Sequence, residues 1–225
     1  AAGRRVRTFH KSQIELGRDR PAGGICLAGA GSAARLEQRD ELMRILLATT
    51  ALGALAVAAP ASAETVISTA VTTPQTTSAS GDIRISSTGS VKPASGVAVT
   101  VNTNNFIKNE GTIQITGAND SAGIVVNGGL AGEITSSGTI TIDENFTPAD
   151  SDTDGDLDGA FAQGANRFGI HVLGAHTGVL TNSGTITVEG NNSGGIVLDG
   201  PLTGTFTNNG NITLLGNDTV GIRTG

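Results

Sequence analysis

The sequence predicts an all-β fold, a parallel β-helix with coils of about 26 residues. A Gly followed by an aliphatic residue recurs with spacings of 27, 46, 26 and 26 residues, at Gly96, Gly123, Gly169, Gly195 and Gly221. Apolar residues within each repeat alternate with Thr or small polar residues, as in Ile186-Thr-Val188, which is the period of a β-strand. Joints rich in Gly, Asn and Asp separate these runs and supply turns. Three short strands and three corners therefore make one coil.

The aligned repeats place six side chains of each coil toward a shared apolar column. One coil contributes Ile186, Val188, Ile196, Leu198, Leu202 and Phe206. One such set is too small to offset the entropy of ordering a whole coil. The stack must therefore be stabilised by hydrogen bonds and apolar contacts between neighbouring coils.

One corner of the coil carries Asn109, Asn182 and Asn208, with Ser136 in the same place once. Stacked Asn side chains can hydrogen-bond along the column, as in ladders of identical residues. The alternative is that Asn only tolerates the left-handed backbone of a turn. Both alternatives give this position a structural role.

Residues 1–42 lack the repeat and contain scattered Arg residues and the only cysteine, Cys26. Pro21 and several Gly interrupt any amphipathic helix here. We interpret this segment as disordered, non-native sequence translated from DNA upstream of a start at Met43.

Residues 43–63 are typical of a signal peptide, the helical segment that precedes the coils. A charged start at Met43-Arg44 is followed by an apolar stretch over 45–59 and by Ala61 and Ala63. A transmembrane or buried helix is the alternative, but the stretch is short for a span and ends in Ala-Ser-Ala. Cleavage would leave Glu64 as the first residue of a protein exported through the inner membrane, to the cell surface, the outer membrane or the medium.

The chain from Glu64 onward contains 15 acidic and 5 basic residues, so it carries about ten negative charges. Nucleic acid binding requires a basic face, so a nucleic acid partner is not expected. Residues 64–80 are rich in Thr, Ser and Ala without a clear period, and we expect them to cap the first coil. Residues 81–225 form the coils, and we expect the solenoid to continue beyond Gly225.

Residues 143–166 form an acidic insertion, which accounts for the one spacing of 46. Its alternate carboxylates follow the order of a calcium loop, at Asp150, Asp152, Asp154, Asp156 and Asp158. The twelfth position is Phe161 instead of the usual Glu, and neither flank has a helical pattern. The pattern leaves two interpretations open, a weak calcium site and a solvated acidic loop without a cofactor.

Two histidines, His171 and His176, occupy different faces of one predicted coil. His176 aligns with inward Leu130 and Leu202, whereas His171 aligns with outward positions. Because they do not share a face, we interpret them as packing and surface residues and not as a metal pair.

The exported signal, the lack of a later cysteine and the Asn-x-Gly-x-Ile-Thr coils at 182–188 and 208–214 resemble one known family. The segment from Met43 to Gly225 is similar to the N-terminal passenger part of an autotransporter of Gram-negative bacteria. The resemblance implies a β-helical passenger on the cell surface and a C-terminal outer-membrane β-barrel that translocates it. It also implies a surface ligand, on a host, a matrix or a neighbouring cell, that the residues do not identify.

The leading interpretation of function is a structural stalk or adhesin without enzymatic activity, since the recurring residues of the repeat are Thr, Asn, Gly and aliphatic residues, none of which is reactive. The alternative is a β-helical polysaccharide lyase or hydrolase, which needs paired carboxylates or calcium with a basic residue. The insertion aspartates and Arg167 are the candidates for that chemistry. A serine protease passenger is not expected, because the sequence lacks the Gly-x-Ser-x-Gly motif.

The signal peptide prediction concerns the N-terminus of exported protein. Cleavage after Ala63 should give material that begins at Glu64, which N-terminal sequencing of the exported fraction checks. Exported protein that retains any of residues 1–42 would contradict both the cleavage point and the start at Met43.

Overall fold

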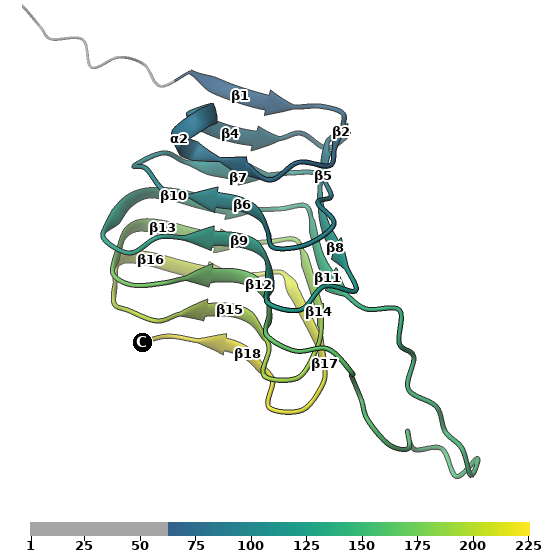
Figure 1. Cartoon of the computed structure of the whole chain (residues 1–225). Coiled ribbons are helices and arrows are strands. Elements are labelled where there is room, and N and C mark those ends of the chain that lie inside the picture. The colour runs from purple at the N-terminus through teal and green to yellow at the C-terminus, as the bar shows by residue number, and fades with distance from the viewer. Residues whose placement is uncertain (1–62) are drawn as a thin grey trace, which may run out of the picture. The chain divides into compact units, whose positions relative to one another are not determined.

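The computed structural model describes residues 63–225, and these residues form a parallel β-helix (Figure 1). Three sheets of six strands each run the length of the stack, and every pairing within them is parallel. The fold class predicted from the repeat is confirmed. The only helix in this part of the chain is α2 (Thr77–Ser80). None of the described residues form a helix long and apolar enough to cross a membrane.

Each coil contributes one strand to each sheet. The first sheet contains β1 (Glu64–Ile67), β4 (Asp82–Ile85), β7 (Ile107–Asn109), β10 (Leu130–Ser136), β13 (His176–Asn182) and β16 (Leu202–Asn208). The second contains β2 (Ala70–Val71), β5 (Ser90–Val91), β8 (Thr112–Thr116), β11 (Thr139–Asp143), β14 (Thr185–Glu189) and β17 (Asn211–Leu215). The third contains β3 (Gln75–Thr76), β6 (Val97–Val101), β9 (Ser121–Val126), β12 (Arg167–Val172), β15 (Gly194–Leu198) and β18 (Val220–Arg223).

The register between coils reproduces the spacings of the sequence repeat. The side-chain hydrogen bond from Asn182 to Asn208 joins residues 26 apart, and that from Asn109 to Ser136 joins residues 27 apart. The bond from Asn166 to Asp120 spans 46 residues, across the insertion. The insertion therefore leaves the pairing of the coils in register on both sides.

The core is a column of aliphatic side chains inside the coils. Ile186, Val188 and Ile196 have no exposed surface, and Leu198 is 1% exposed. Leu202 and Phe206 also pack against this core but remain half-buried. They lie in β16, which pairs with β13 alone in the described part of the chain. The six predicted inward positions are confirmed. Leu202 and Phe206 differ from the other four only in being half-buried instead of buried.

The Asn corner forms hydrogen bonds between coils at two of its steps. The Asn109 side-chain amide donates to Ser136 Oγ at 3.1 Å, and that of Asn182 donates to Asn208 Oδ1 at 2.8 Å. Asn109 and Asn182 are fully buried. The ladder interpretation is therefore confirmed for these two pairs of coils. The bonds satisfy the side-chain NH₂ groups, whereas the Oδ1 atoms of Asn109 and Asn182 have no hydrogen-bond partner among the described residues.

The Gly two residues after the ladder Asn is required by the close approach of the coils. A Cβ atom added to Gly184 would overlap the carbonyl oxygen of Gly138 in the preceding coil. Gly184 is absent from the positive-φ residues, so left-handed backbone is not the reason for Gly here. The turn explanation applies elsewhere, as at Gly117, where φ is 79°.

Residues 64–80, for which a cap is predicted, form the first turn of the stack. They contain β1, β2, β3 and α2, which are shorter than most later strands. Thr77 at the start of α2 is 2% exposed, and its hydroxyl accepts the backbone amide of Asn102 at 3.0 Å. This short first coil pairs with β4, β5 and β6.

The burial pattern predicts that the same substitution, to Asp, has a large effect on stability in one strand and almost none in the preceding strand. Ile196→Asp would bury a carboxylate in the apolar column and should lower the free energy of unfolding by several kcal/mol. Thr187 occupies a partly exposed outward position. Thr187→Asp should therefore change the free energy of unfolding by at most about 0.5 kcal/mol. Denaturant unfolding measures both variants, and equal shifts of their midpoints would contradict the assigned faces.

Candidate functional site

The acidic insertion leaves the stack after β11, which ends at Asp143, and returns at β12, which begins at Arg167. Figure 1 shows this segment as a green loop that extends beyond the strands. Ala149 and Asp158 form an isolated antiparallel bridge, so the two halves of the loop run side by side there. The five predicted aspartates all lie in this segment.

Three of the five aspartates gather at one point. The carboxylates of Asp150, Asp152 and Asp158 lie within 4.8 Å of one another, and Asp154 and Asp156 are not part of this group. Carboxylate oxygens suit calcium, which takes six to eight oxygen ligands, so these three residues would supply only part of a site.

The same carboxylates already accept hydrogen bonds from the loop backbone. Asp158 Oδ2 accepts the Ser151 amide at 2.6 Å, and Asp150 Oδ1 accepts the Thr153 amide at 2.7 Å. The bond from the Ser151 amide holds the pKa of Asp158 below its usual range. These backbone donors stabilise the charged loop without an ion, so calcium binding stays a prediction.

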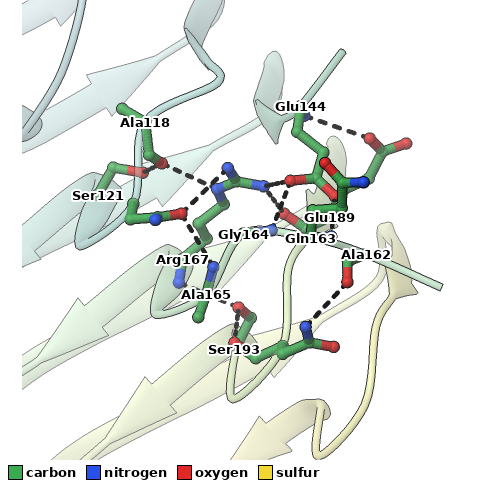
Figure 2. Close-up of polar contacts among 12 residues, drawn as sticks. Ala118, Ser121, Glu144, Ala162, Gln163, Gly164, Ala165, Arg167, Glu189 and Ser193 are labelled. Atoms are coloured by element: carbon green, nitrogen blue, oxygen red, sulfur yellow. Dashed lines mark hydrogen bonds and ion pairs between the residues drawn. The ribbon is translucent and has the colours of Figure 1, made fainter. Parts of the chain in front are cut away.

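Arg167, the basic residue considered for polysaccharide chemistry, lies at the base of the insertion and not beside the aspartates. Its side chain is 1% exposed. Figure 2 shows the guanidinium among backbone oxygens and one carboxylate. Nη1 donates to Glu144 Oε2 at 2.9 Å and to the Glu189 carbonyl at 2.6 Å, and Nε donates to the Ala118 carbonyl at 2.8 Å. The structure therefore does not bring Arg167 together with the five aspartates.

A second polar feature lies on the outer face of the third sheet. His171 Nε2 and Asp199 Oδ2 are 2.7 Å apart, and Arg223 forms an ion pair with the other oxygen of Asp199. Burial raises the pKa of Asp199, but the bonds from His171 and Arg223 outweigh it and keep that pKa below its usual range.

A hollow of about 320 Å³ lies beside His171. It is bordered by Val97, Val125, Phe168, His171, Asp120 and Asn166. The Phe168 and His171 rings stack with centroids 4.3 Å apart, and the Asn166 side chain donates to Asp120 Oδ1 at 2.9 Å. The lining of the hollow thus combines aromatic, apolar and polar side chains.

The two histidines occupy the faces that the sequence predicts. His176 is buried, 2% exposed, and its Nε2 lies 3.2 Å from the Gly132 carbonyl oxygen. His171 faces outward. The predicted cleavage point is described only in part, because Ala61 lies outside the described residues. Ala63 and Glu64 are both exposed.

Sequence reasoning missed Glu144 and Asp199 as partners. The register places Arg167 opposite Ser121, and Ser193 holds the equivalent position in the next coil, immediately before Gly194. An Arg in place of a small repeat residue was a usable signal of a special contact. The approach of His171 to Asp199 had no such signal, since it depends on how two coils are stacked.

The comparisons with known proteins give one result. A family model described as the BigA third pectate lyase-like domain matches residues 22–224. Neither the curated proteins nor the solved structures contain a match.

The calcium prediction concerns the order of the loop. If Asp150, Asp152 and Asp158 bind calcium, the ion should protect the segment around Gly155 from proteolysis at a Kd of ~10⁻⁴–10⁻³ M. Asp152→Asn with Asp158→Asn should abolish that protection, while Asp218→Asn, outside the insertion, serves as the control. Identical cleavage with calcium and with chelator would leave the solvated loop as the explanation.

Proposed function

Because the chain belongs to the family of the BigA third pectate lyase-like domain, we propose that it is an exported β-helical protein of the cell surface. Its coils act as a stalk or an adhesin, and it is not an enzyme. The observation that carries this proposal is the regularity of the stack, in which each coil pairs with the next across three sheets. Coils about 4.8 Å apart that share one column form a stiff rod, which suits a spacer or a display surface.

The autotransporter resemblance supplies the route to the surface in this proposal. A signal peptide over 43–63 directs export, and an outer-membrane β-barrel translocates the passenger. The described residues contain no cysteine, so the coils fold without disulfides in an oxidising compartment. Acidic residues outnumber basic ones from Glu64 onward, which favours a solvated surface over binding to polyanions.

The adhesive role requires an outward surface that can contact a ligand. The outer face of the third sheet supports it best, because Phe168 and His171 border a hollow whose lining also includes Asp120 and Asn166. Aromatic rings beside hydrogen-bonding groups suit ligands that have both apolar and polar surface.

Polysaccharide recognition or degradation is the second candidate function, favoured by this hollow and by the pectate lyase-like description of the family. A sugar ring offers C–H groups to aromatic rings and hydroxyls to polar side chains. Binding is favoured over cleavage, because the donors of Arg167 are engaged inside the protein by Glu144, Glu189 and Ala118.

One experiment in a Gram-negative host tests the surface role. The full chain, joined to its natural downstream sequence, should bind an antibody against the coils on intact cells, and external protease should remove that signal. Coils detected only after cell lysis would overturn the proposal.

The outer hollow is tested on the same displayed protein. Phe168→Ala should lower binding of cells to immobilised polysaccharide or to host matrix at least tenfold. Val179→Ala, which changes an exposed residue of the first sheet, should not. New reducing or unsaturated sugar ends released from polygalacturonate, and lost in Phe168→Ala, would favour the enzyme over the adhesin.

A further inference from the structure

The coil that carries the insertion differs from its neighbours at one buried position. Ser121 and Ser193 occupy this position in the adjacent coils, and each is 1% exposed. Arg167 replaces them here, and its backbone amide donates to Ser193 Oγ at 3.0 Å. A guanidinium therefore lies where the repeat requires only a small hydroxyl.

Burying this cation is costly unless its charge and its donors are matched. The partners that match it all lie next to the insertion. Glu144 is the first residue after β11, and the Ala118 and Glu189 carbonyls belong to the coils on either side. Arg167 Nη2 also donates to Asn119 Oδ1 at 3.4 Å. The regular coils have no need of Arg at this position, so its role arises from the insertion.

Glu144 joins the two ends of the insertion through one carboxylate. Oε1 accepts the Gln163 amide at 2.7 Å, and Oε2 accepts both the Gly164 amide at 2.7 Å and Arg167 Nη1 at 2.9 Å. Gln163 and Gly164 lie just before β12, so the chain leaves and returns at the same point (Figure 2). Ala162 also belongs to this junction, because it is buried and its carbonyl accepts the Asn191 side-chain amide at 2.9 Å. Residues 145–161, called the arm below, lie outside it.

The strands beside the junction keep their pairing independently of the arm. β11 pairs with β8 and β14, and β12 pairs with β9 and β15. The Glu144 contacts are therefore additional to the strand pairing, and Asn191 of the next coil also donates to the Ala162 and Gly164 carbonyls of the returning chain.

We propose that Glu144 and Arg167 form a clasp that closes the interrupted coil, so that the base of the arm opens and closes as a unit separate from the stack. With the clasp closed, the arm is held in a fixed direction at the side of the solenoid. With the clasp open, the arm is tethered by its ends while the coils remain folded.

The charged groups around Glu144 determine the pH at which the clasp opens. Arg167 bonds to its carboxylate, the Glu189 carboxylate accepts its backbone amide at 3.3 Å, and Asp143 precedes it on β11. Burial raises the pKa of Glu144, but the bonds from Gln163, Arg167 and Gly164 outweigh it, so this pKa lies below its usual range. Because the folded pKa is depressed, the clasp is fully closed at neutral pH and opens as pH falls through that lowered value.

Hydrogen exchange on the full chain tests the clasp directly. In Glu144→Gln, exchange at the Gln163 and Gly164 amides should be at least tenfold faster, and protease should cut the arm at least tenfold faster. Exchange of the Ile196 amide in the core should change less than twofold. Glu110→Gln removes the charge from a partly exposed carboxylate that pairs with Arg84 and Lys108. It is the matched control and should leave exchange of all three amides unchanged.

Arg167→Ser restores the residue of the regular repeat, and comparing it with a double variant distinguishes loss of the clasp from general destabilisation. The single variant leaves Glu144 without its cation, so it should be less stable than the double variant Arg167→Ser with Glu144→Gln. The double variant should have an open arm and folded coils. Unchanged exchange at Gln163 and Gly164 in Glu144→Gln, or equal acceleration at Ile196, would overturn the proposal.

The unaltered chain provides a second measurement if these variants do not fold. As pH is lowered, exchange at Gln163 and Gly164, corrected for its intrinsic pH dependence, should rise before the circular dichroism of the coils changes. Simultaneous loss of both signals would mean that the arm and the stack are one unit.

Discussion

Parallel hydrogen bonding between successive coils is the constraint on which the rest of this structure depends. Each strand pairs with the equivalent strand of the next coil, so equivalent residues must lie about 4.8 Å apart along the stack. That spacing aligns Ile186 with Ile212 in the core and Asn182 with Asn208 at the corner. It also explains Gly184, where the neighbouring coil leaves no space for a Cβ atom. A side chain at a given position of the coil must therefore fit against the side chain at the same position of the neighbouring coil.

The insertion shows how a stacked fold accommodates a segment that does not repeat. The coils on both sides remain in register, and the junction concentrates its irregularity in Glu144 and Arg167. A buried ion pair is weak evidence for stability by itself. Here it satisfies two backbone amides that the returning chain would otherwise leave without partners. The aspartates farther out are served by amides of their own loop, so the acidic charge does not disturb the core.

The outward faces of the sheets are where a protein of this architecture can acquire function. Most outward positions carry Thr, Asn or small residues, and the third sheet alone combines Phe168, His171 and Asp199 on one face. A hollow lies beside Phe168 and His171 on this face. The stacked coils provide a rigid scaffold, and the few residues that depart from the repeat provide aromatic and charged groups on its surface.

The sequence by itself determined the fold, because the 26-residue period and the alternation of Thr with aliphatic residues specify which side chains face inward. It also identified the Asn corner, the insertion and the opposite faces of His171 and His176. Only the tertiary structure decided which residues meet across coils. Glu144 with Arg167, and His171 with Asp199, are more than 20 residues apart, and no local pattern encodes their approach. The same holds for Leu202 and Phe206, whose partial exposure depends on the neighbouring coil and not on their own strand. Periodicity encodes the face of a residue, whereas contacts between different repeat positions depend on the path of the whole chain.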